Sequence, residues 1–289
     1  MKDTYLLAEK DVGPQESSLA RDLIKGTVKE HQKAGKMPFM LRFSQGTLSR
    51  EVYARFILSF YHIYKALEEK MEEKASDESI KAIHFPKELS RLESIEKDLE
   101  FYLGPDWREE AKTLSPAVEA YINDINKAAE RHPALLAAHT FTRYLGDLWG
   151  GQKLAKKLAK ALDLPREGDF AYVGRHFYYF ENISNLPKFR SMYTESYNQM
   201  KVDPELRREI VYEAINAFNL NMALFAELEE LELEQKRLTE KELGSLDVQE
   251  KASTETTDGG FTLNHLALPL AATLILTVIV GVRTIIKTK

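Results

Sequence analysis

The feature that most constrains this chain is a helix-like segment that carries three glycines within six residues. The segment runs from Pro133 to Leu164, with a proline at its first position and Pro165 just after its end, as is common at helix boundaries. Its centre, residues 143–152, reads Arg-Tyr-Leu-Gly-Asp-Leu-Trp-Gly-Gly-Gln. Each glycine costs about 1 kcal/mol relative to alanine inside a helix. The missing side chains must therefore serve a purpose.

This segment allows two interpretations. Glycine lets a helix bend and lets a flat or bulky group approach its backbone closely. Asp147 lies beside the gap, and a carboxylate in such a place needs a partner, a water network or a function. The segment therefore predicts either the lid over a bound cofactor or the close packing of two helices through small residues. These residues alone do not separate the two.

Composition excludes several classes of protein. A net charge of −5 argues against a nucleic-acid-binding protein, which would carry a basic stripe. The absence of cysteine excludes disulfides, thiolate-ligated heme and iron–sulfur clusters or zinc fingers held by cysteine, and it fits a domain in the reducing cytosol. No apolar run follows the first residues, so we expect no signal peptide.

The end of the chain has a different character. Residues 266–282 are uncharged and mostly aliphatic, and 17 residues of helix span roughly 26 Å. With snorkelling by Arg283, residues 263–286 predict a transmembrane tail anchor, and the alternative is a buried core helix. The polar tract 237–262 predicts a flexible linker. Basic residues follow the span, and the positive-inside rule would place these residues in the cytosol and the preceding domain on the other side of the membrane. Despite this conflict, we expect the preceding domain in the cytosol.

The remaining chain predicts an all-α fold in one domain, residues 16–236, after an N-terminal arm, residues 1–15. Apolar residues recur at helical spacing between prolines and glycines, and no alternating strand pattern of useful length occurs. The aromatic stretch 170–180 is ambiguous and predicts a loop with a short helix. The other predicted helices are Ser17–Ala34, Leu48–Lys74, a segment after Pro86 that ends at Gly104, a segment from Ser115 to His132, Pro187–Met200 and a last helix from Pro204 to about Gln235.

The seven histidines include one candidate ligand. No Glu-x-x-His, His-x-x-x-His or His-Glu-x-x-His occurs, which excludes a ferritin-like di-iron bundle and a zincin-type site. His31 continues the apolar stripe of Ile24 and Val28, so its imidazole should face the core. A core-facing histidine is either a hydrogen-bonded structural residue or a ligand. Together with the glycine-notched helix, His31 could enclose a flat macrocycle.

The chain resembles the heme (haem) oxygenases, and in particular the membrane-anchored animal enzymes. The resemblance covers about residues 16–235 and the tail, and it is carried by several motifs in the family's order. These motifs are Thr27-x-x-x-His31, Ser49-Arg50-Glu51, residues 61–69, residues 85–89, Thr142–Leu148 and Ala217-Phe218-x-x-Asn221.

The resemblance implies an activity and a set of roles. Heme b would be both cofactor and substrate, with His31 as the axial ligand to its iron. Gly146 and Gly150 would let the distal helix approach the heme, and Asp147 would order waters beside the iron. Tyr64, Arg143 and Asn221 match the supporting polar network, and Gly151, Phe141 and Phe218 match the heme surroundings.

The resemblance also implies products, partners and a location. The products would be biliverdin, carbon monoxide and ferrous iron, made with dioxygen. Electrons would come from NADPH through NADPH–cytochrome P450 reductase, and biliverdin reductase would be a further partner. The chain would be tail-anchored in the endoplasmic reticulum membrane, with its catalytic domain facing the cytosol.

The chain departs from the family pattern in the lid and at the propionate contacts. Trp149 replaces a small serine after Gly-Asp-Leu, so its indole either points away from heme or crowds the oxygen pocket. The propionate-binding lysines of the family fall where this chain has Ile24 and Val28; Lys25 and Lys29 lie one residue away, about 100° round a helix.

The second propionate region is also altered. Arg190 keeps one basic position there, whereas Thr194 and Phe141 stand where an arginine and a tyrosine are usual. Besides an active heme-degrading enzyme, these departures leave open a heme-binding sensor or store of the same fold without turnover. A third interpretation, a tail-anchored helical interaction protein without heme, treats the notched helix as packing.

Overall fold

The computed structural model describes residues 18–168 and 171–255, and within them every regular element is a helix. The all-α prediction is therefore confirmed for the described residues. The chain divides into two compact units, residues 1–230 and 231–289, and the site discussed below lies in the first. The longer elements are α1 (Leu19–Ala34), α2 (Pro38–Gln45), α3 (Arg50–Glu73), α5 (Leu92–Leu103), α7 (Pro116–Arg131), α9 (Gln152–Ala161), α10 (Leu186–Ser196) and α11 (Pro204–Glu255).

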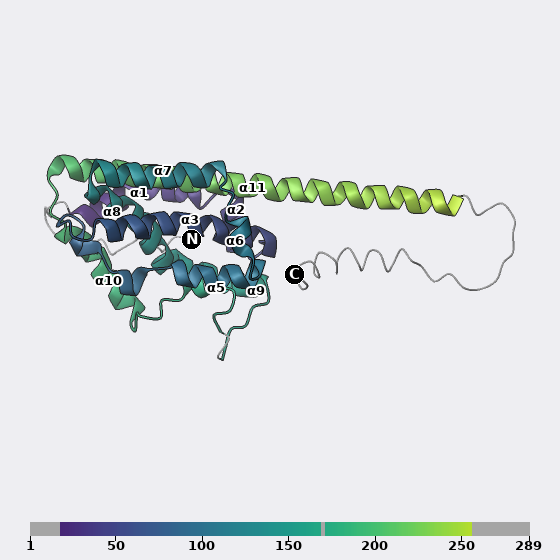
Figure 1. The fold of residues 1–289 in the computed structure, drawn as a ribbon, viewed down its shortest axis with the longest axis horizontal. Coiled ribbons are helices and arrows are strands. Elements are labelled where there is room, and N and C mark those ends of the chain that lie inside the picture. Colours follow the sequence, from purple (N-terminus) through teal and green to yellow (C-terminus); the bar gives the residue numbers. More distant parts are fainter. Residues whose placement is uncertain (1–17, 169–170, 256–289) are drawn as a thin grey trace. The chain divides into compact units, whose positions relative to one another are not determined.

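Helix α3 forms the centre of the core. Its Ser49 cap accepts a hydrogen bond from the backbone N–H of Val52, as expected for a serine N-cap. Most of the apolar side chains along α3 are buried, and the helix packs against α5 and α7 (Figure 1). A serine also caps α7, where Pro116 occupies the first turn. These are the boundary signals on which the sequence prediction depended.

The glycine-notched segment is helical but not a uniform α-helix. It begins with a 3₁₀ turn, η2 (Pro133–Leu135), and α8 (Leu136–Thr140) follows. Two π-helical stretches come next, η3 (Phe141–Leu145) and η4 (Asp147–Gly151), before α9. Wide π turns are rare and concentrate at functional sites. The predicted single helix is therefore correct in extent to within a few residues, whereas its widened centre was not predicted.

Some boundaries differ from the prediction. Helix α2 was missed, although Pro38 begins it and Gly46, with a left-handed φ of 74°, ends it. The predicted end of the last helix near Gln235 is wrong, because α11 continues to Glu255. Residues 237–255, expected as flexible linker, are rich in glutamate, lysine and leucine and contain no proline, so helix propensity favours continuation.

The remaining elements are short. They are η1 (Lys81–Ile83), α4 (Pro86–Leu89), α6 (Trp107–Glu110), η5 (His176–Tyr178) and η6 (Tyr197–Gln199). The aromatic stretch 170–180 thus contains one 3₁₀ turn, as the prediction of loop with a short helix required. None of the described helices has both the length and the apolar character that a membrane crossing needs. The predicted anchor, residues 263–286, and the predicted arm, residues 1–15, lie outside the described residues.

Candidate active site

A cavity lies where α1, η3, η4 and α11 come together. Its volume is about 250 Å³. His31 of α1, the glycines and Asp147 of the notched helix, and Asn221 of α11 all line it. Most of the other lining residues are apolar, among them Met40, Phe56, Phe60, Leu154, Phe177 and Phe225. An apolar cavity with a few convergent polar groups is the usual form of a small-molecule site.

The glycines divide into two groups by what a side chain would meet. A Cβ atom built on Gly146 or Gly150 would have no neighbour within 4 Å, although both residues line the cavity. A Cβ on Gly151 would lie 3.0 Å from Cδ1 of Tyr178, and one on Gly26 would overlap Cγ1 of Val211. Close packing therefore explains Gly151 and Gly26. It does not explain Gly146 and Gly150, which present bare backbone to the cavity.

His31 lines the same cavity from α1, with its ring edge toward Phe218 at a centroid distance of 6.0 Å. Burial lowers the pKa of His31, so the imidazole is neutral near pH 7. A neutral imidazole is the form that ligates a metal. Val28, predicted on the same inward stripe, is instead 42% exposed.

Asp147 is buried and paired with Tyr64 of α3. The Tyr64 hydroxyl donates a hydrogen bond to Oδ2 of Asp147 across 83 residues of sequence. Burial raises the pKa of Asp147 to about 7, although Arg143, Tyr64 and Arg91 each favour the charged form. The cavity therefore contains a carboxyl group that gains and loses its proton near neutral pH. Groups poised in this way concentrate at functional sites.

Two further polar side chains, those of Arg143 and Asn221, line the cavity. Arg143 is 8% exposed and its guanidinium lies over the ring of Phe60 at 4.9 Å. Asn221 donates to the backbone oxygen of Ala217 at 2.9 Å and lies 3.4 Å from the hydroxyl of Tyr121. The Nε of Arg143 and the Oδ1 of Asn221 are buried and lack hydrogen-bond partners among the described residues. Buried polar atoms of this kind call for an explanation, and a ligand or its waters would provide one.

Trp149 lies in the wall of the cavity and is held there by Arg190. The Arg190 guanidinium stacks on the indole at 3.9 Å, and its Nη1 donates to the backbone oxygen of Leu148 at 3.3 Å. Thr194, one turn further along α10, lines the cavity and donates to the backbone oxygen of Arg190 at 2.8 Å. Trp149 thus neither turns wholly away from the cavity nor fills it, because it is one of the residues that line the open space.

Some of the residues predicted from the sequence line the cavity, and others do not. Lys25 and Lys29 are exposed and do not line the cavity, so their predicted contact with a ligand stays a prediction. Tyr64 reaches the site only through Asp147, and Arg190 only through Trp149. The predicted residues that line the cavity are His31, Phe141, Arg143, Gly146, Asp147, Gly150, Gly151, Thr194, Phe218 and Asn221.

Sequence reasoning missed Tyr178 and Arg91. Tyr178 is 4% exposed, lines the cavity and packs on Gly151, but it comes from the aromatic stretch without periodicity. Arg91 is 3% exposed, with its guanidinium 4.0 Å from the ring of Phe180, and its charge lowers the pKa of Asp147. No local signal in the sequence could have placed either residue near Asp147.

The comparisons with known proteins agree with this geometry. A family model described as heme oxygenase matches residues 17–227. Human heme oxygenase 1 is 40% identical over 222 residues, which cover 75% of this chain and 75% of the human protein. The chain belongs to the heme oxygenase family.

Other family members support the same assignment. Rat heme oxygenase 2 is 35% identical over 222 residues, with 77% of this chain and 69% of the rat protein covered. The crystal structure of heme oxygenase-1 from the cyanobacterium Synechocystis in complex with heme is similar with a TM-score of 0.71 and 36% identity. It covers 80% of this chain and 100% of the cyanobacterial chain. Heme oxygenases are enzymes that degrade heme.

Heme fits the residues that line the cavity. A flat macrocycle needs a wall without side chains, which Gly146 and Gly150 provide, and a neutral imidazole, which His31 provides. Arg143 and Asn221, each with a buried atom that lacks a partner among the described residues, provide polar groups in the lining of the cavity. The lid interpretation of the notched helix is therefore favoured over simple packing at two of its three glycines.

Proposed function

We propose that this chain cleaves heme oxidatively to biliverdin, carbon monoxide and ferrous iron. The observation that carries the proposal is that His31 and the bare backbone of Gly146 and Gly150 line one cavity from two different helices, with Asp147 between the two glycines in sequence. Membership of the heme oxygenase family supports the same reaction.

The residues divide into those that hold heme and those that hold a proton. His31 would ligate the iron, and the walls made by Phe141, Phe218 and Trp149 would contact the macrocycle. Bound heme supplies an iron that binds dioxygen and a macrocycle that is itself the substrate. The chain supplies polar groups to the cavity, Arg143 and Asp147 from the notched helix and Asn221 from α11.

Asp147 would act as a proton-holding and water-orienting group. Its pKa of about 7 lets the carboxyl group exchange a proton at neutral pH at little cost. The hydroxyl of Tyr64 fixes Oδ2, so the other carboxyl oxygen is the one that can orient water in the cavity. Arg143 and Asn221 would extend this water network through the atoms that have no partner among the described residues.

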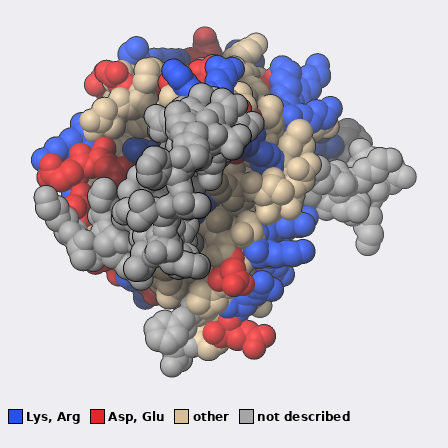
Figure 2. All heavy atoms as spheres, turned by 90° about the vertical axis from the view of Figure 1, so that its right-hand side faces the viewer, with Lys and Arg blue, Asp and Glu red and all other residues tan. Residues whose placement is uncertain are grey.

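Electrons would come from NADPH through NADPH–cytochrome P450 reductase. Helix α9 follows directly on the notched helix and exposes Lys153, Lys156, Lys157 and Lys160, and it contains no acidic residue. Figure 2 shows Lys and Arg side chains gathered along one side of the face that it views. A basic surface next to the cavity suits an acidic redox partner, because opposite charges speed association and fix orientation.

The location is proposed from the sequence. The apolar run within residues 263–286 would anchor the chain in the endoplasmic reticulum membrane, with residues 16–236 as the catalytic domain facing the cytosol. A membrane-bound reductase would then share the same surface, and biliverdin reductase could take up the product from the cytosol.

The test is spectroscopic and uses the full-length chain. Hemin should bind with a Soret band, and His31→Ala should abolish the axial ligation. Addition of the reductase and NADPH under air should convert the bound heme to biliverdin, with release of carbon monoxide. If hemin binds but no biliverdin forms, the enzyme proposal fails and the alternative, a heme-binding sensor or store, is favoured. If no Soret band forms, both fail.

A further inference from the structure

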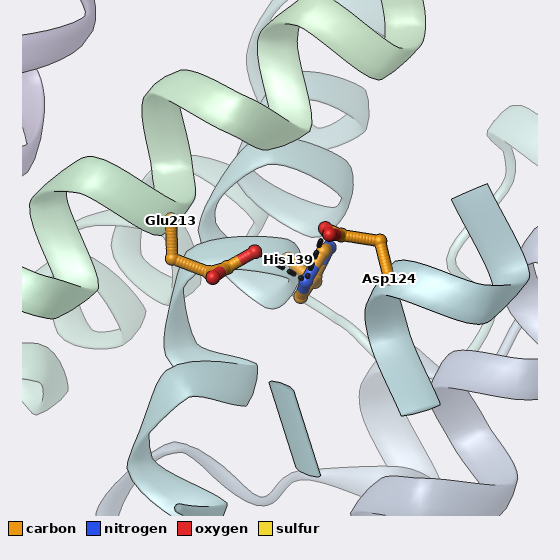
Figure 3. A group of neighbouring side chains, drawn as sticks. All are labelled: Asp124, His139 and Glu213. Atoms are coloured by element: carbon orange, nitrogen blue, oxygen red, sulfur yellow. Dashed lines mark ion pairs between the residues drawn. The ribbon is translucent and has the colours of Figure 1, made fainter. Parts of the chain in front are cut away.

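A second group of ligand-type side chains lies away from the heme cavity, at the junction of three helices. Asp124 comes from α7, His139 from α8 and Glu213 from α11, and Figure 3 shows the imidazole between the two carboxyl groups. One ligand atom from each residue lies within 4.8 Å of the others. None of the three lines the cavity that contains His31.

The imidazole is unusual because it is completely buried without a hydrogen bond. His139 is 0% exposed, and neither ring nitrogen has a hydrogen-bond partner among the described residues. Its Nε2 points between the carboxyl groups, 3.6 Å from Oδ2 of Asp124 and 3.5 Å from Oε1 of Glu213. A hydrogen bond from a charged imidazole to a carboxylate would be about 2.7–2.9 Å. The observed separations lie within ion-pair range but are longer than such a hydrogen bond.

The same separations suit a metal ion. Tetrahedral zinc sites have metal–nitrogen and metal–oxygen distances of about 2.0–2.2 Å, which place neighbouring ligand atoms about 3.4 Å apart. Two carboxylates and one neutral imidazole carry a charge of −2, which a divalent cation would neutralise.

Neighbouring side chains hold the carboxyl groups in place. Asn216 donates through Nδ2 to Oδ1 of Asp124 at 2.9 Å and lies 3.4 Å from Oε1 of Glu213. Nη1 of Arg131 lies 3.3 Å from Oε2 of Glu213. Oδ2 of Asp124, which faces His139, thus remains without a hydrogen-bond partner among the described residues, whereas Oε1 of Glu213 faces both His139 and the Asn216 amide. Outer partners of this kind orient the ligands of metal sites.

We propose that Asp124, His139 and Glu213 form a binding site for a divalent transition-metal ion such as Zn²⁺. Three protein ligands leave one coordination position for water. The ion would join α7, α8 and α11, and α8 leads directly into the π-helical stretch that carries Arg143. The site would be structural and separate from the iron of heme. The half-buried Asp124, with a side chain 24% exposed, provides the route of entry.

The test uses the untagged full-length chain, free of heme and stripped of metal with a chelator. Titration with Co²⁺ should produce visible d–d absorption that saturates at one equivalent, and Zn²⁺ should displace it and raise the melting temperature. His139→Gln and Asp124→Asn should each weaken Co²⁺ binding by at least about tenfold. Asp124→Asn serves as the second variant because its partly exposed site is the more tolerant of substitution.

Two matched controls separate this site from other ligands. Glu209→Gln removes another acid of α11 that also pairs with Arg131, and it should leave binding unchanged. His31→Ala should also leave it unchanged, which excludes the heme ligand as the source of the signal. Circular dichroism establishes that each variant is folded.

The proposal is overturned if the wild-type chain shows no saturable binding, or if folded His139→Gln retains it. The proposal is also overturned if nuclear magnetic resonance detects a protonated His139 at neutral pH after Zn²⁺ has been added to the protein, because the cluster would then be an ion pair.

Discussion

The glycines of the notched helix make the sharpest prediction, because Gly146→Ala should have opposite effects on folding and on heme binding. Gly146 has φ −57° and ψ −47°, which alanine adopts without strain. The added Cβ meets no atom within 4 Å. Alanine is favoured over glycine in a helix by about 0.5–1 kcal/mol. The free energy of unfolding of the heme-free chain should therefore rise by up to about 1 kcal/mol.

The same methyl group should weaken heme binding, because it projects into the space that the macrocycle would occupy. Inserting a methyl group into a packed contact costs about 1–3 kcal/mol. With 1.4 kcal/mol for each tenfold change, the Kd for heme should increase roughly 5- to 140-fold. A variant that folds better and binds worse cannot be explained by general damage to the fold.

Gly26→Ala is the matched control, since it adds the same methyl group to a helix where the space is filled. Its Cβ would overlap Cγ1 of Val211. Overpacking of about 1–3 kcal/mol, less the gain in helix propensity, should give a net loss of stability of up to about 2 kcal/mol. Heme affinity should stay close to that of the wild type.

The assays are urea denaturation of the full-length chain followed by helical circular dichroism, and heme titration followed by Soret absorbance. The reasoning is refuted if Gly146→Ala destabilises the chain as Gly26→Ala does, since Gly146 would then be a packing glycine. It is equally refuted if Gly146→Ala binds heme as tightly as the wild type.

Three further predictions concern the polar wall and the lid. Burial raises the pKa of Asp147 from 3.8 to about 7, so between these pH values the folded chain holds a proton that the unfolded chain has lost. The free energy of unfolding should therefore fall as the pH rises from about 4 to about 7, by up to about 1.4 kcal/mol per pH unit. Asp147→Asn should remove this contribution, and urea denaturation at several pH values measures it; equal slopes in the two proteins would contradict the assignment. Tyr64→Phe removes a hydrogen bond worth about 1.5–3 kcal/mol to the charged form of Asp147, so the pH midpoint of biliverdin formation should move up by about one to two units while heme binding is kept. An unmoved midpoint would exclude Tyr64 from that role. Trp149→Ala removes the stacking of Arg190, worth about 0.5–1 kcal/mol, and should speed heme loss to apomyoglobin roughly 2- to 5-fold, with Trp149→Phe retaining part of the effect. An unchanged rate of heme loss would show that the stacking of Arg190 on Trp149 does not help to retain heme.

Local chemistry determined much of the fold. Ser49 and Ser115 cap their helices through their own side chains, and proline fits the first turn of a helix wherever it occurs, so these starts are written in a few adjacent residues. Helix ends were harder to predict. The last helix continues past Gln235 because no glycine–proline signal stops it there, and composition alone suggested a linker.

The sequence by itself determined that the chain contains a glycine-notched helix with one acid and another helix with an inward histidine, because both are patterns within single helices. Only the tertiary structure decided which glycines face a cavity, since Gly146 and Gly151 look alike until Tyr178 is placed against one of them. It also decided that Tyr64 reaches Asp147 and that Asp124, His139 and Glu213 converge. These contacts join residues far apart in the chain, and no local preference specifies them; they follow from how the helices pack.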